Sequence, residues 1–166
     1  MSEDKVIVAV EPEAAALRER FEQEYKDAAR SRDTLAVSTL RLLRAAVQDL
    51  LVARTDAKRK DFGQPLTAAD VIAIIEKQIK QRGESAEAFD KGGRASQAAQ
   101  ERAEADFLRR YMPQKMERAE IEAVVQRLVS ELGPDFRKVM PAAAKELKGK
   151  ADGRLIQEVV RQATGG

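Results

Sequence analysis

The sequence contains no cysteine, no histidine and no tryptophan among its 166 residues. Without cysteine the chain has neither disulfides nor a thiolate nucleophile. Without histidine it also lacks the common zinc sites, the Ser-His-Asp triad and imidazole general-base catalysis. Serines are few, and the sequence shows neither a glycine-rich phosphate loop nor an obvious cluster of carboxylates. We therefore predict no self-sufficient catalysis, no catalytic residue, no metal site and no cofactor.

Long apolar runs are also missing. The longest strongly apolar run covers residues 6–10, which is too short to span a bilayer or to form the core of a signal peptide. We therefore expect a soluble, cytoplasmic protein with no membrane partner.

Positive charges outnumber negative charges only slightly. The formal net charge is +2, which does not by itself indicate a nucleic-acid binder. The distribution is more informative, because Lys and Arg exceed Asp and Glu by five in residues 30–60 and by three in residues 134–166. The sequence thus offers two weakly basic regions.

The composition favours helices. Ala, Leu, Ile, Val, Glu, Gln, Lys and Arg dominate, which is typical of packed helices rather than of a sandwich or barrel. We predict an all-α fold with an N-terminal helical domain of about four helices in residues 13–113 and a three-helix tail domain in residues 114–166. Residues 1–12 are expected to form a flexible arm, whose β-prone run 6–10 has no partner strand downstream.

Apolar residues that recur at three- and four-residue steps place the helices of the N-terminal domain. The first helix is expected over about 13–30, and the second from Asp33 or Thr34 to about Lys58. The third should begin at a capping-box-like pair, Thr67 and Asp70, and end at 91–93. The fourth should run from 94 to about 111. The last two helices, joined by a two-glycine turn, should form a long antiparallel hairpin.

Three shorter helices are expected in the tail. The first should stop at Gly133-Pro134, and Asp135 should cap the second. Pro141 lies inside the second helical run, so we expect a kink or a late start there. Such a small unit has a marginal core.

A basic turn, residues 148–154, separates the last two apolar-periodic segments. Gly149 lies where a C-cap glycine belongs and can adopt a left-handed conformation, and Asp152 is expected to be the N-cap of the last helix. The start of that helix should offer unpaired N–H groups beside basic side chains, which suits a phosphate. A turn that only reverses the chain would need the same residues, so the pattern alone favours a structural role. Phe136, the nearest aromatic, has the phase of a core residue, so base stacking is not expected.

Several separated stretches follow one another in order along the chain: Arg32-Asp33, Ser38-Thr39-Leu40-Arg41-Leu42-Leu43-Arg44, Lys77-Gln78-Ile79-Lys80-Gln81-Arg82, Glu84-Ser85, Phe89, Val139-Met140 and Gly149-Lys150-Ala151-Asp152-Gly153-Arg154. Through these stretches the chain resembles the YqeY family, also called GatB/YqeY, from about Leu17 to Ala163. The resemblance implies an all-helical protein of two parts. Its tail is similar to the C-terminal domain of the B subunit of tRNA-dependent amidotransferases, where the tail helps to hold the tRNA body away from the chemistry. Some family members also resemble an appendage of glutaminyl-tRNA synthetases.

Carried over to this chain, the resemblance implies tRNA-binding candidates in the tail. These are Lys148, Lys150 and Arg154, followed less directly by Arg137 and Lys138. Arg41 and Arg44, in the N-terminal signature, form a secondary basic surface. Pro141 departs from the family pattern, in which a proline comes later in the segment.

Three functions remain open at this point. The first is a non-catalytic tRNA-binding accessory module, which contacts backbone phosphates and reads RNA shape more than sequence. The second is an adaptor that docks on an aminoacyl-tRNA synthetase or an amidotransferase subunit. The third is carbon-nitrogen ligase activity, with glutamine as amide donor, only as part of a larger complex; the resemblance alone suggests it.

Overall fold

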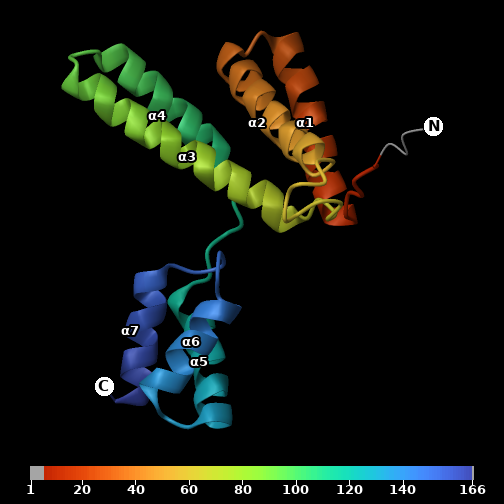
Figure 1. The fold of residues 1–166 in the computed structure, drawn as a ribbon. Helices are drawn as coiled ribbons and strands as arrows, with labels where there is room; N and C mark the ends of the chain where they lie inside the picture. Colours follow the sequence, from red (N-terminus) through yellow and green to blue (C-terminus); the bar gives the residue numbers. More distant parts are fainter. Residues whose placement is uncertain (1–5, 166) are drawn as a thin grey trace. The chain divides into compact units, whose positions relative to one another are not determined.

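The computed structural model describes residues 6–165. Within this range it contains seven α-helices and no strand, which confirms the predicted all-α fold (Figure 1). The helices are α1 Pro12–Ser31, α2 Thr34–Ala53, α3 Ala68–Lys91, α4 Ala95–Arg109, α5 Arg118–Leu132, α6 Phe136–Glu146 and α7 Gly153–Thr164. The chain divides into two compact units, and the boundary falls between Met112 and Pro113.

The N-terminal unit consists of two helical hairpins, α1 with α2 and α3 with α4 (Figure 1). Between α1 and α2 the chain turns at Arg32, which has a left-handed φ of 58°, and the Asp33 side chain accepts the N–H of Ala36 at 3.0 Å. Helix α2 contacts the three other helices of the unit. It therefore buries a wide apolar face, which includes Leu40 and Leu43.

The third helix begins with the predicted capping box. The Thr67 hydroxyl accepts the N–H of Asp70 at 3.1 Å, and the Asp70 carboxylate accepts the N–H of Thr67 at 2.9 Å. Helix α3 continues through Gly83, since a single glycine weakens a helix without ending it. A turn at Gly92 and Gly93 then leads into α4.

The second helix ends earlier than predicted. We expected it to reach about Lys58, but α2 stops at Ala53 and Arg54 is its C-cap. The Arg54 guanidinium is buried and donates to the Asp70 carboxylate at 2.8 and 2.9 Å, to the Pro65 carbonyl at 2.7 Å and to Asp61 at 3.2 Å. These acceptors lie further along the chain, so the backbone has to fold back around Arg54 instead of continuing as a helix.

The N-terminal arm has no partner strand within residues 6–165, as predicted, but it pairs with a downstream segment at one isolated β-bridge between Val10 and Leu66. The carbonyl of Ala9 accepts the N–H of Leu66 at 2.8 Å, and the N–H of Glu11 donates to the carbonyl of Leu66 at 2.9 Å. The side chains of Val8 and Val10 pack against the core of the unit. Part of the apolar run is thus used inside the domain. Residues 1–5 of the expected arm lie outside the described residues.

Helices α5, α6 and α7 surround a core of their own in the C-terminal unit. Fully buried aliphatic side chains from all three helices meet there: Ile121, Val125, Val139, Ala143 and Val160. Helix α6 begins at Phe136, directly after its cap Asp135, and continues through Pro141. The alternative of a late start is therefore wrong. The proline lacks only the N–H that would bond to the Arg137 carbonyl, and it lies on the exposed side of the helix.

Candidate nucleic-acid interface

The loop between α6 and α7 is fixed by backbone hydrogen bonds. The carbonyl of the buried Leu147 accepts the N–H groups of Lys150 at 2.9 Å and Ala151 at 3.2 Å. The carbonyl of Lys150 in turn accepts the N–H of Met116 at 2.8 Å, so the segment that precedes α5 lies beside the loop. Gly149 has a φ of +75°, which confirms the predicted left-handed conformation, although it lies two residues beyond the C-cap Leu147. This frame leaves the side chain of Lys150 exposed to solvent.

The start of α7 differs from the expectation. Asp152 is the N-cap as predicted, but its carboxylate accepts the N–H of Arg154 at 2.9 Å and the N–H of Leu155 at 3.2 Å. The hydrogen bonds from Leu155 and Arg154 also lower the pKa of Asp152 below its ordinary value, because they stabilise the ionised form. The prediction of free N–H groups for a phosphate is therefore wrong for these two groups. Any anion at this loop has to be held mainly by side chains.

The three basic side chains of the loop, Lys148, Lys150 and Arg154, are exposed. Among residues 6–165, none of them has a carboxylate oxygen within 4.0 Å. The ion pairs within the C-terminal unit are instead made by two other arginines. They are Arg118 with Glu122 and Glu158, and Arg127 with Glu131 and Glu146. The loop cations thus keep their charge available for a ligand.

Sequence reasoning missed one further cation at this loop. The positive charge of Lys115 contributes to the lowered pKa of Asp152, after the hydrogen bonds from Leu155 and Arg154, so Lys115 lies close to the loop. Its neighbour Met116 is bonded to the carbonyl of Lys150. No local spacing could have revealed this contact, because 34 positions separate Met116 from Lys150 along the chain.

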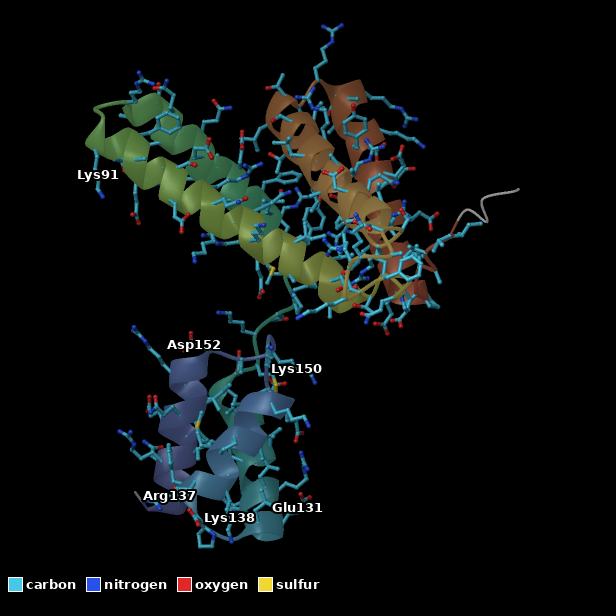
Figure 2. The ribbon with its side chains drawn as sticks, in the orientation of Figure 1. Lys91, Glu131, Arg137, Lys138, Lys150 and Asp152 are labelled. Carbon is cyan, nitrogen blue, oxygen red and sulfur yellow. The ribbon has the colours of Figure 1, made fainter. Side chains whose placement is uncertain are left out.

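Arg137 and Lys138 do not join the loop. They lie in the first turn of α6, whereas the loop follows the last turn, and Figure 2 shows them at the opposite end of the unit from Lys150 and Asp152. Ten residues of helix correspond to about 15 Å along the axis. The five tail candidates therefore form two separate basic groups, one at each end of α6.

Arg41 and Arg44 belong to α2 of the N-terminal unit. Together with Arg18 they line an open groove between α1 and α2 with a volume of about 540 Å³. Arg44 forms an ion pair with Glu22, and its guanidinium lies 4.4 Å from the centre of the Tyr25 ring. The charge of Arg44 is thus already engaged within the hairpin, whereas Arg41 is exposed.

Two negative findings concern the described residues alone. Residues 6–165 contain no group of three or more acidic side chains placed to hold a metal ion. No helix in the same range is both long enough and apolar enough to cross a membrane.

The comparison with protein families covers nearly the whole chain. A family model described as Yqey-like protein matches residues 18–164. The chain belongs to the YqeY family. The family match includes both the α1–α2 groove and the α6–α7 loop. A search of curated proteins found no match.

Proposed function

We propose that this YqeY protein is a cytoplasmic, non-catalytic tRNA-binding module that works with aminoacyl-tRNA synthetase or amidotransferase systems. It contacts backbone phosphates through Lys148, Lys150 and Arg154. One observation carries the proposal: these side chains are exposed and have no carboxylate partner among residues 6–165, while the acids nearby are engaged elsewhere. Unengaged Lys and Arg on a fixed loop are what phosphate contacts require.

The charge distribution also favours the C-terminal unit as the part that binds RNA. Residues 113–166 contain ten Lys or Arg and eight Asp or Glu, so the whole formal excess of two positive charges lies in the C-terminal unit. Two of the eight acids, Asp135 and Asp152, are N-caps whose carboxylates accept backbone N–H groups. The loop carries a net positive charge, because its three cations Lys148, Lys150 and Arg154 outnumber its one acid, the ionised Asp152.

The proposed mode of recognition reads RNA shape. Phe136 is partly buried and packs against the core of the unit, which leaves it unsuited to base stacking. Side-chain cations that contact phosphates position a nucleic acid without reading its sequence. We therefore expect similar affinity for different tRNAs and strong competition by salt.

A binding titration with unfractionated tRNA tests the proposal. The variant Lys148→Ala/Lys150→Ala/Arg154→Ala is compared with Lys77→Ala/Lys91→Ala/Arg94→Ala, which removes three exposed cations from the N-terminal unit. The loop variant should bind at least about tenfold more weakly than the wild type, because three phosphate contacts are lost. The matched variant should bind like the wild type. Equal weakening in the two variants would show that net charge alone drives binding and would refute the loop as the site.

A second variant separates the two ends of α6. Arg137→Ala/Lys138→Ala removes the cations at the start of the helix and leaves the loop intact. If tRNA contacts the loop alone, this variant should bind as the wild type does. A loss as large as that of the loop variant would instead place both ends of α6 in contact with the RNA.

A further inference from the structure

The groove between α1 and α2 has an apolar floor and a charged rim. Phe21 and Val47 form the floor and are almost completely buried. The rim consists of Arg18, Glu19 and Glu22 from α1 and of Arg41, Arg44 and Gln48 from α2. The exposed Ala45 lies along the α2 side and leaves room above the floor. A concave surface of this kind is typical of a partner or ligand site.

The charges of the rim are partly engaged. Glu22 forms ion pairs with Arg44 and, at 3.6 Å, with Lys26. Arg18 and Arg41 have no carboxylate oxygen within 4.0 Å among residues 6–165. Among the rim residues, Glu19 is the only acidic side chain outside these ion pairs. The groove therefore keeps a net positive charge, which an acidic occupant complements.

The shape of the surface favours a helix as that occupant. Ala45, Gln48 and Val52 recur at steps of three and four residues, so they share one face of α2. Val52 is apolar and yet 58% exposed. From Arg41 to Val52 the face extends over three helical turns, about 16 Å. The groove itself is lined by α2 only from Arg41 to Gln48, about 10 Å, and a third helix that lies along it would reach the exposed Val52 beyond that end.

We propose that this groove docks an amphipathic helix of a protein partner. Acidic side chains of that helix pair with Arg18 and Arg41, and its small apolar side chains cover Ala45 and Val52. Arg44 is already held by Glu22 and Tyr25, so it presents a fixed guanidinium at the groove wall. This docking does not depend on tRNA binding by the α6–α7 loop.

An RNA backbone fits the groove less well. A phosphate backbone has no apolar face to set against Ala45 and the floor formed by Phe21 and Val47, whereas an amphipathic helix has one. Residues 1–112 contain twenty Lys or Arg and twenty Asp or Glu, so this part of the chain has no general attraction for a polyanion.

The test is a titration of the ¹⁵N-labelled full chain, followed by amide chemical shifts. The probe is a capped amphipathic peptide of about four helical turns, with alanine and leucine on one face and glutamates along its edge. The control peptide carries glutamines in place of the glutamates. The acidic peptide should shift amides of α1 and α2 around the groove, and the control peptide should bind several-fold more weakly.

Three protein variants complete the test. Arg18→Ala/Arg41→Ala should weaken binding of the acidic peptide about tenfold, whereas the matched Lys91→Ala/Arg94→Ala should leave it unchanged. Ala45→Phe fills the groove without altering any charge and should abolish the shifts, and its unchanged helical circular dichroism would show that it folds.

Three results would overturn the proposal. They are an absence of shifts around the groove, equal binding of the acidic and the glutamine peptide, and groove shifts that tRNA causes and the peptide does not. The last result would make the groove a phosphate site instead.

Discussion

Replacing Arg54 by alanine should strongly destabilise the N-terminal unit. The guanidinium makes two hydrogen bonds to Asp70 and one to the Pro65 carbonyl, and its side chain is 6% exposed. Removing one partner of a buried ion pair costs about 3 to 5 kcal/mol. The Asp70 side chain remains 25% exposed and keeps its hydrogen bonds from Thr67, so solvent and the cap compensate in part. We expect a loss of about 3 kcal/mol in the free energy of unfolding.

The assay measures the unfolding of the N-terminal unit alone. Both tyrosines of the chain, Tyr25 and Tyr111, lie in the N-terminal unit and there is no tryptophan, so tyrosine fluorescence in urea reports its unfolding. The control is Arg59→Ala, because Arg59 also binds Asp61 but is exposed. The control should lower the midpoint far less than Arg54→Ala does, because the Arg59 ion pair is exposed to solvent. A loss below about 1 kcal/mol for Arg54→Ala, the range of a surface ion pair, would refute the idea of a buried clamp.

Three further predictions concern acid, the contact of Tyr111 with Glu24, and the tail loop. The bonds from Arg59 hold the pKa of Asp61 at about 2. Burial raises the pKa of Asp70, but the bonds from Arg54 and Thr67 lower it by more. The stability that these two aspartates contribute is therefore complete above their unfolded pKa near 3.8, and in acid-denaturation curves it should fall as the pH drops toward 2. Tyr111→Phe removes a partly buried hydrogen bond to Glu24 and should cost about 1 kcal/mol in urea unfolding. In the wild type, burial and then Glu24 raise the pKa of the Tyr111 phenol, so this phenol should resist ionisation in an alkaline absorbance titration. Gly149→Ala places a side chain at a φ of +75° where no atom lies within 4 Å, so strain alone should destabilise the tail by about 1 kcal/mol in thermal melts.

Local signals predicted the fold well where the deciding interaction spans a few residues. Thr67 with Asp70, Asp152 before α7, and Gly149 in the loop all act over one turn of chain, so their spacing was sufficient. The same limit explains the failure at α2, because the acceptors of Arg54 lie up to 16 residues away and outweigh a helical pattern that runs past Ala53.

The candidate site was predictable only in part for the same reason. The loop cations follow one another in sequence and were found, but Lys115 approaches them through a contact that tertiary packing creates. Arg137 and Lys138 are near the loop in sequence, and the length of α6 separates them from it in space. The occupied N–H groups of α7 were missed because the side chain of Asp152 supplies the anion itself.

The salt dependence of tRNA binding tests the central claim most directly. The logarithm of the association constant should fall linearly with the logarithm of salt concentration for the wild type. For Lys148→Ala/Lys150→Ala/Arg154→Ala the slope should be shallower by about 2 to 3, since each lost phosphate contact removes somewhat less than one unit. Adding Lys115→Ala should reduce the slope further. A loop variant with the wild-type slope, or a wild type that fails to bind tRNA even at low salt, would contradict the account.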